Sequence, residues 1–229
     1  MRILEVVAAT VAFVLLLPVM ALIAIAIRVV AGGPVLFRQR RAGRWGRPFT
    51  IWKFRTMDMR DARCCGDPER CIGLQMAPGT PVPRLFEGLR RSGLDELPQL
   101  VNVIAGHMSV VGPRPLMLRY TDRYTKEQRR RLDVRPGITG WAQVSGRTDL
   151  EWDARLALDV WYVAHRSVRL DLEILARTVR VAVLGSGFSQ SGSHTGYEFQ
   201  GIRPRDGRCP AADEPPVSTE RAIVSEQAT

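Results

Sequence analysis

Two adjacent carboxylates, Asp95 and Glu96, form a pair that could do covalent chemistry. They lie in the segment Leu94–Gln99, directly before apolar residues that recur at helical spacing. An aspartate can attack phosphorus and form an acyl phosphate, while a neighbouring carboxylate can ligate Mg²⁺ together with substrate phosphates. The same pair at the start of a helix would also complement the helix dipole and cap free amides. Taken alone, the pair supports both interpretations.

Arginines lie around this acid pair at places where the backbone is restrained. They precede the pair or adjoin a glycine or a proline, and they are Arg90, Arg91, Arg114, Arg135 and Arg147. A guanidinium held on a fixed backbone can bind a phosphate through two parallel N–H groups. One such arginine is expected by chance in an arginine-rich chain, whereas several of them near one acid pair favour a phosphate-binding site.

The run from Arg135 to Arg147 adds a glycine-rich element. Its three glycines allow the backbone to turn sharply or to approach a ligand closely, and they are Gly137, Gly140 and Gly146. The run is neither a Walker loop nor a dinucleotide fingerprint, because its glycine spacing differs and it lacks the Lys-Ser/Thr pair. The four cysteines have no C-x-x-C spacing, so neither a zinc site nor a redox pair is predicted.

The composition points to an anionic partner. The 229 residues suffice for one compact domain with an anchor. The chain has 33 Lys+Arg against 23 Asp+Glu and a net charge of +10. Such an excess suits nucleic acid, anionic lipid or phosphorylated small molecules. No nucleic-acid-binding motif accompanies the scattered basic residues, so we do not expect a nucleic-acid partner.

The elements that must position these groups begin with an apolar segment. No residue from Val6 to Ile27 is charged, and as a helix this stretch would be about 33 Å long, the thickness of a bilayer core. The arginines that follow it place its C-terminal end in the cytoplasm by the positive-inside rule, and they are Arg28, Arg38, Arg40, Arg41, Arg44 and Arg47. Pro18 predicts a kink in the middle. Two topologies stay open: a span with Met1 outside the cell, and a helix broken at Pro18 that returns to the same side.

Beyond the anchor the pattern predicts an α/β domain with mostly helices and a small sheet. Residues 34–57 predict a strand hairpin with its turn at Gly43–Arg47. Helices are expected at about 84–89, 94–106, 116–132, 150–164 and 170–184, a short strand at 109–112, and a loop with a strand at 135–147. Residues 58–83 are predicted to be a loop and residues from about 204 to be disordered. We therefore divide the chain into an anchor (1–31), a catalytic domain (32–203) and a tail (204–229).

These blocks together resemble the bacterial sugar transferases, the monotopic phosphoglycosyl transferases, from Arg2 to about Gly201. The matching motifs, in chain order, are Phe37-x-Gln39-x-Arg41-x-Gly43, Lys53-Phe54-Arg55-Thr56-Met57, Asp95-Glu96, Met108 to Pro115, Arg135 to Arg147, Leu158 to Val163 and Leu170-Asp171-Leu172. Motifs of this length in this order are highly specific. The chain is similar in length to the minimal members, which lack an extra multi-span region.

The resemblance implies a reaction and the residues that perform it. Asp95 would attack the β-phosphate of a UDP-sugar, release UMP and carry the phosphosugar until a polyprenyl phosphate attacks in turn. Glu96 would hold Mg²⁺. Phosphates of the two substrates would be held by arginines, namely Arg90, Arg114, Arg147 and, from its place before Pro136-Gly137, Arg135.

The resemblance also implies a location and partners. The anchor would be a re-entrant helix broken at Pro18, with both ends cytoplasmic and the catalytic domain on the inner leaflet of a bacterial membrane. The reaction would be the first membrane step in the assembly of a polysaccharide or glycoconjugate. Besides the membrane lipids and the two substrates, a second copy of the chain or downstream glycosyltransferases are candidate partners.

Four positions differ from the pattern common in the family. Leu17 and Gly93 stand where serine is common, His107 where aspartate is common, and Ser145 where asparagine is common. Loss of a carboxylate at His107 would alter metal affinity and keeps one alternative open, an anchored non-catalytic basic protein that binds anionic lipid or a partner. None of the four changes the acid pair or the arginines, so activity is the expectation.

Overall fold

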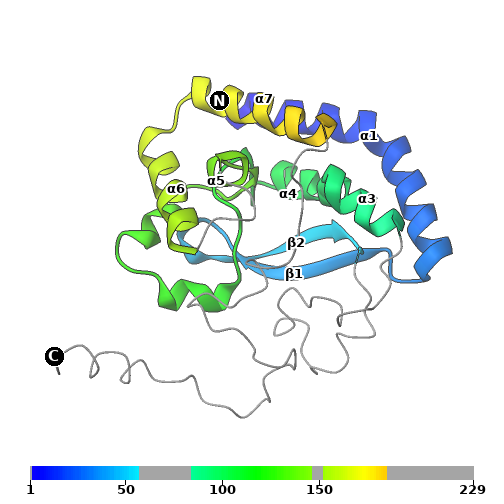
Figure 1. Cartoon of the computed structure of the whole chain (residues 1–229), viewed down its shortest axis with the longest axis horizontal. Coiled ribbons are helices and arrows are strands. Elements are labelled where there is room, and N and C mark those ends of the chain that lie inside the picture. The colour runs from blue at the N-terminus through cyan, green and yellow to red at the C-terminus, as the bar shows by residue number, and fades with distance from the viewer. Residues whose placement is uncertain (1, 57–83, 146–151, 185–229) are drawn as a thin grey trace, which may run out of the picture.

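The computed structural model describes residues 2–56, 84–145 and 152–184. Within these ranges the chain is mostly helical, with two small two-stranded sheets and an N-terminal apolar helix, as the sequence predicts (Figure 1). The predicted loop at 58–83 and the predicted disordered tail at 204–229 lie outside the described residues.

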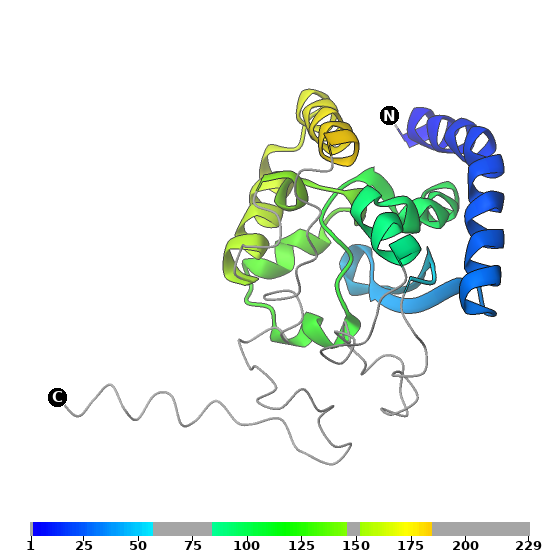
Figure 2. The same cartoon turned by 45° about the vertical axis from the view of Figure 1, so that its right-hand side comes forward.

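The apolar helix α1 (Arg2–Ala31) bends in its middle. Figures 1 and 2 show its first half lying across the top of the molecule and its second half running down one side. Pro18, inside the helix, has no N–H to donate to the preceding turn and so favours a kink. The helix is long and apolar enough to cross a membrane, with a mean hydropathy of 2.8 in its most apolar window.

Both halves of α1 pack against the rest of the domain. Ala9 in the first half is buried in a cluster with Val103, and Ile23 and Ile27 in the second half are buried in another cluster with Phe54. The outer face of α1 is apolar and exposed, as shown by Ile3, Leu4, Val11, Leu15, Leu22 and Ile25. The helix therefore covers two sides of the domain and does not project from it as a straight rod.

The predicted strand hairpin is confirmed. β1 (Leu36–Ala42) pairs antiparallel with β2 (Pro48–Phe54), with Leu36 opposite Phe54 and Ala42 opposite Pro48. The turn between the strands contains the short 3₁₀ segment η1 (Arg44–Gly46).

The two faces of the hairpin differ in burial, because side chains alternate along a strand. Gln39 and Ile51, a cross-strand pair, are buried on one face, while Arg40 is exposed on the other. Arg41 and Lys53 share the face of Gln39 and Ile51 by the same alternation. The hairpin thus directs two cations toward the helical segments that cover this face.

A 3₁₀ segment carries the acid pair. The helix α3 (Arg84–Ser92) ends at Gly93, whose left-handed φ of 71° is typical of helix termination. There follow η3 (Leu94–Gln99) and α4 (Leu100–Ile104), where the sequence predicts one continuous helix. Pro98 cannot donate the α-helical bond to Leu94, so this turn has 3₁₀ geometry.

Two short parallel strands, β3 (Ser109–Val111) and β4 (Gly137–Thr139), hold the next segment in place and confirm the strands predicted there. The N–H of Gly112 donates to the carbonyl of Thr139 at 2.9 Å, and the N–H of Gly137 donates to that of Pro113 at 3.0 Å. A Cβ on Gly137 would overlap the backbone nitrogen of Gly112. This close approach requires glycine at position 137.

The single helix predicted at 116–132 is wrong. Two 3₁₀ segments, η4 (Leu118–Arg123) and η5 (Gln128–Leu132), occupy this stretch. Tyr124 between them is extended, with φ −74° and ψ 136°. Its ring is buried in a cluster with Tyr120 and Leu156. The stability gained by this burial offsets the loss of helical hydrogen bonds at the break.

Three helices complete the described part of the chain: α5 (Trp141–Ser145), α6 (Trp152–His165) and α7 (Val168–Leu184). The last two match the predicted helices. α7 and the first half of α1 lie along the same side of the molecule (Figures 1 and 2).

Candidate active site

The turn η3 holds the acid pair inside the domain. Asp95 is 8% exposed and Glu96 is 9% exposed. Leu94 and Leu97 pack with the buried cluster that includes Phe54 of β2. These apolar contacts fix the segment, while the two carboxylates face charged groups from other elements.

Glu96 binds two cations from distant parts of the chain. Nζ of Lys53 donates to Oε1 of Glu96 at 2.5 Å, and Nη2 of Arg114 donates to the same oxygen at 3.0 Å. Burial would raise the pKa of Glu96, but the charges of Arg114 and Lys53 lower it to about 2. Glu96 is therefore an anion at any physiological pH, and it fixes two cations beside Asp95.

Asp95 has the opposite shift. Burial raises the pKa of Asp95 to about 6, with Lys53 acting to lower it and Glu96 acting to raise it further. At neutral pH this carboxylate is mostly ionised and poorly solvated, which suits a nucleophile. A phosphate ester beside it would have its charge neutralised by Lys53 and Arg114.

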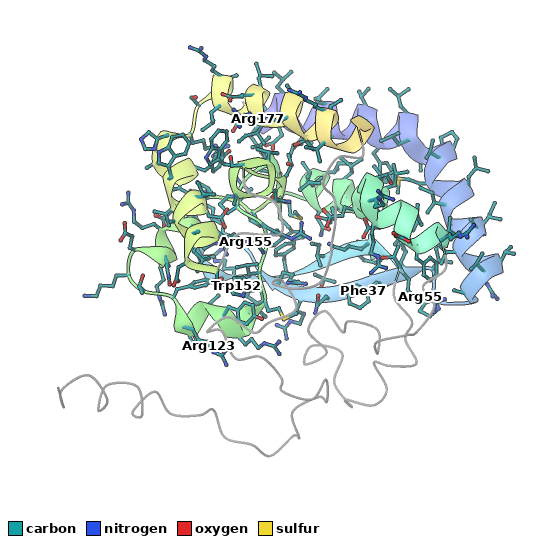
Figure 3. All side chains as sticks on the ribbon, viewed as in Figure 1. Phe37, Arg55, Arg123, Trp152, Arg155 and Arg177 are labelled. Carbon is teal, nitrogen blue, oxygen red and sulfur yellow. The ribbon has the colours of Figure 1, made fainter. Side chains whose placement is uncertain are left out.

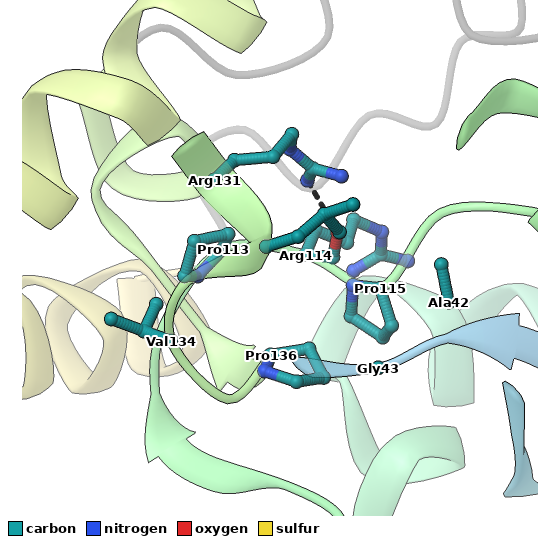
Figure 4. Close-up of a pocket in the computed structure, with 9 residues that line it drawn as sticks. Ala42, Gly43, Pro113, Arg114, Pro115, Arg131, Val134 and Pro136 are labelled. Carbon is teal, nitrogen blue, oxygen red and sulfur yellow. Dashed lines mark hydrogen bonds between the residues drawn. The ribbon is translucent and has the colours of Figure 1, made fainter. Parts of the chain in front are cut away.

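A buried network holds the backbone of Arg114. Nη2 of Arg131 donates to the carbonyl oxygen of Arg114 at 2.7 Å (Figure 4) and to Oδ2 of Asp159 at 2.7 Å. Nη1 of Arg131 also donates to the hydroxyl of Tyr124 at 3.1 Å. Prolines on both sides of Arg114 restrict the backbone further. Residues of η5 and α6 therefore fix the point from which Arg114 reaches Glu96.

Several predicted site residues meet at this place. The acid pair and Arg114 are in direct or neighbouring contact, as described above. Arg90 lies half-buried in the last turn of α3, just before the turn that carries the acid pair. Its predicted role in binding phosphate fits this place and stays a prediction.

Other predicted residues lie elsewhere. Nε of Arg135 donates to the carbonyl of Gly106 at 2.9 Å, and the charges near it include Arg2 and Glu5 at the start of α1. Arg147 lies outside the described residues. The phosphate-binding roles of both arginines stay predictions.

The acid pair fits the way proteins commonly bind Mg²⁺. No group of three or more His, Cys, Asp or Glu gathers among the described residues, but one or two carboxylates suffice when substrate phosphates supply the other oxygens. In the described contacts both cations bind Oε1 of Glu96, so a metal would depend on Oε2. His107 is exposed and stacks on Phe49, with ring centroids 6.1 Å apart.

Sequence reasoning missed the role of Lys53. Alternation along the predicted strand places Lys53 on the same face as Ile51, which is buried. A lysine on a buried face requires an anionic partner, so the signal was present. Arg131 and Asp159 gave no comparable signal, because Arg131 is one of three consecutive arginines and only the fold selects the one that turns inward.

Comparisons with known proteins agree with the chemistry of this site. The family model described as bacterial sugar transferase matches residues 1–185. The uncharacterized sugar transferase EpsL of Bacillus subtilis (strain 168) is 43% identical over 176 residues, which cover 76% of this chain and 83% of the relative. A UDP-glucose:undecaprenyl-phosphate glucose-1-phosphate transferase of Escherichia coli (strain K12) is 38% identical over 183 residues, covering 76% of this chain and 38% of the relative.

A third relative carries another sugar in its name. The UDP-N-acetylgalactosamine-undecaprenyl-phosphate N-acetylgalactosaminephosphotransferase of Aeromonas hydrophila is 37% identical over 191 residues, covering 80% of this chain and 43% of the relative. The chain thus spans less than half the length of both of these substrate-named relatives.

Proposed function

This chain belongs to the bacterial sugar transferase family, and on that basis we propose that it moves a sugar 1-phosphate from a UDP-sugar to a polyprenyl phosphate. The observation that carries the proposal is the buried acid pair, in which Asp95 has a raised pKa and Glu96 binds Lys53 and Arg114. The named relatives act with undecaprenyl phosphate, one with UDP-glucose and one with UDP-N-acetylgalactosamine. The proposed step is the first membrane step in the assembly of a glycan.

The proposed reaction consists of two displacements at one phosphorus atom. In the first, a carboxylate oxygen of Asp95 bonds to the β-phosphorus of the UDP-sugar, and the bond from this phosphorus to the bridging oxygen breaks, so that UMP leaves with the electron pair. In the second, an oxygen of polyprenyl phosphate bonds to the same phosphorus, and the bond to Asp95 breaks. The carboxylate is regenerated, and one nucleophile serves both anionic substrates in turn.

The surrounding residues would neutralise and orient the phosphates. Lys53 and Arg114, fixed by Glu96, lie where charge spreads over the phosphoryl oxygens during each displacement. Glu96, with Asp95 beside it, would hold Mg²⁺, which supplies further neutralisation of phosphate charge. Arg90 would add a guanidinium from the neighbouring turn of α3, and Arg135 and Arg147 stay candidates for the same task.

We propose further that α1 is re-entrant, with both of its ends on the cytoplasmic side. Nη2 of Arg2 donates to the carbonyl of Val103 at 2.6 Å, and Nη2 of Arg55 donates to the carbonyl of Ala31 at 2.6 Å. Both ends are thus tied to the same domain. A straight helix of 30 residues would be about 45 Å long and would carry one end across the bilayer, away from the domain.

The exposed apolar side chains support a position on the membrane surface. α7, which lies along the same side of the molecule as the first half of α1 (Figures 1 and 2), has exposed apolar residues, namely Val168, Leu172 and Val179. Arginines on the same helix would face lipid phosphates, and they are Arg169, Arg177 and Arg180. An acceptor whose isoprenoid tail stays in the lipid requires a site at such a surface.

The covalent intermediate can be tested with donor alone. The purified full chain, given Mg²⁺ and each UDP-sugar of a panel but no acceptor, is expected to release about one UMP per protein with the correct donor. The peptide that contains Asp95 should gain the mass of the phosphosugar, and polyprenyl phosphate should remove it. UMP release that requires the acceptor, with no adduct at any stage, would indicate direct transfer and contradict the proposal.

The raised pKa of Asp95 predicts the pH dependence of the reaction. The nucleophile must be ionised, and with a pKa of about 6 its ionised fraction rises about tenfold from pH 5 to pH 7. Bound Mg²⁺ would lower this pKa, so kcat/KM for the donor is expected to rise with pH and level off at or below pH 7. A rate that is constant from pH 4.5 to 8, or that still rises tenfold per pH unit above 7, would contradict this assignment.

A further inference from the structure

Two arginines near Arg114 have no part in the function proposed above. Arg41 extends from β1 on the hairpin face that carries Lys53. Its Nη2 donates to Oε1 of Gln39 at 2.5 Å, while its Nε is buried and has no hydrogen-bond partner among the described residues. A buried guanidinium N–H without a hydrogen bond lowers the stability of the fold. A ligand oxygen that accepted from this N–H would remove that cost.

The second arginine, Arg155, lies on α6. It stands one helical turn before Asp159, the residue that anchors the network behind Arg114, and so shares its side of the helix. Its guanidinium lies over the ring of Trp152, 5.4 Å from the ring centroid (Figure 3). Neither Arg41 nor Arg155 forms an ion pair with a carboxylate in the described part of the chain.

Charge in this neighbourhood is unbalanced. Burial and the positive charge of Arg114 lower the pKa of Arg41 to about 10 and also lower the pKa of Arg155. Among the described residues, the charges of Lys53, Arg114 and Arg41 act on Glu96, and Arg155 adds a further positive charge beside Arg114. Positive charges here therefore outnumber the two carboxylates of the acid pair. The diphosphate of a nucleotide-sugar carries about two negative charges and would offset this excess.

Arg155 lies away from α7, and Arg41 lies beside η4. α6 rises from Trp152 toward α7 at the top of the molecule, so Arg155 lies near its distant end (Figure 1). Arg41 interacts electrostatically with Tyr120 of η4, whose ring meets that of Trp152 edge-on with centroids 5.6 Å apart. An acceptor tethered to lipid approaches from α1 and α7, whereas a water-soluble donor can occupy the opposite side.

We propose that Arg41 and Arg155 bind the nucleotide-side phosphate of the donor, the α-phosphate that leaves as part of UMP. This assignment rests on the function proposed above and adds two donor-binding residues to it. Charge on this phosphate increases as the bond to the β-phosphorus breaks, so two guanidinium groups at this place would also stabilise the departing UMP.

The test compares Arg41→Gln and Arg155→Gln with Arg40→Gln, which removes an exposed arginine from the opposite face of the same strand. Binding of UMP to the full chain is measured calorimetrically without turnover, and the KM values of donor and acceptor are measured separately. Each of the first two variants is expected to weaken UMP binding and raise the donor KM about tenfold or more. The acceptor KM should stay within about twofold, and Arg40→Gln should match the wild type in every measurement.

A stability measurement separates binding from folding. Since Arg41 has a buried Nε without a hydrogen-bond partner and forms no ion pair among the described residues, Arg41→Gln is expected to leave the thermal midpoint of the ligand-free protein unchanged or to raise it. Should this variant fail to fold, Arg41→Lys is used instead. It keeps the positive charge but lacks the two parallel N–H groups of the guanidinium. Weaker UMP binding by Arg41→Lys with an unchanged acceptor KM supports the proposal, and unaltered UMP binding overturns it.

The remaining outcomes are also decisive. UMP binding by Arg41→Gln and Arg155→Gln equal to that of Arg40→Gln overturns the proposal while leaving the transferase function intact. A raised acceptor KM with unaltered UMP binding assigns the arginines to the acceptor phosphate and likewise overturns it. A wild-type protein that neither binds UMP nor releases it from any UDP-sugar would refute the proposed function itself.

Discussion

Replacement of Asp95 by asparagine is expected to lower UMP release by at least about 1000-fold. The amide has nearly the same size as the carboxylate but cannot form the bond to phosphorus. Glu96, Lys53 and Arg114 keep their contacts in this variant, because Glu96 is the residue that binds both cations. Donor binding should therefore change by only a few-fold. Steady-state UMP release, the donor-only burst and UMP affinity measure the three expectations.

The Asp95→Asn variant should fold at least as well as the wild type. The folded-state pKa of Asp95 is raised, from 3.8 to about 6, so ionisation of this buried carboxylate costs stability as the pH rises through that window. Asparagine carries no charge and avoids this cost. The thermal midpoint of the variant relative to wild type is expected to rise between about pH 4 and pH 6 and then to level off. A stable variant that retains turnover would remove Asp95 as the nucleophile.

The parts of the fold that the sequence predicted well are those with local patterns. The apolar stretch from Val6 to Ile27 predicts helix α1, and the alternation of residues 36–54 predicts the hairpin. The errors have two causes. Pro98 turns the start of one predicted helix into a 3₁₀ segment because it has no N–H to donate, whereas the break in another predicted helix accompanies burial of the Tyr124 ring. The first cause is local in the sequence, and the second depends on packing against residues distant in the chain.

The candidate site was also predictable only in part, because only some of its residues are neighbours in the sequence. The two acids are adjacent in the sequence, so their residue types alone suggest the chemistry of the pair. The partners of the pair come from positions 43 and 18 residues away, and no local pattern joins Lys53 and Arg114 to Glu96. The inward turn of Arg131 depends on Asp159, 28 residues further along. Such ion pairs are formed by the packing of separate elements.

The second large effect is expected from Asp159→Asn, which should destabilise the protein by about 3–5 kcal/mol. The substitution leaves the guanidinium of Arg131, which is 3% exposed, without its counter-ion. For a chain of this size the thermal midpoint should fall by roughly 10 °C. Asp153→Asn is the matched control, because Asp153 is exposed on the same helix and its loss should change stability by less than about 0.5 kcal/mol.

A double substitution separates the stabilising role of this ion pair from its role in the site. Arg131→Met combined with Asp159→Leu removes both charges, and most of the lost stability should return because no unpaired buried charge remains. The carbonyl of Arg114 nevertheless loses the N–H that holds it at 2.7 Å. We therefore expect kcat/KM to stay about tenfold or more below wild type in a protein of near-normal stability, since small displacements of a charged group cost rate. Full recovery of both properties would mean that the pair only stabilises the fold, and that the prolines beside Arg114 suffice to aim it at Glu96.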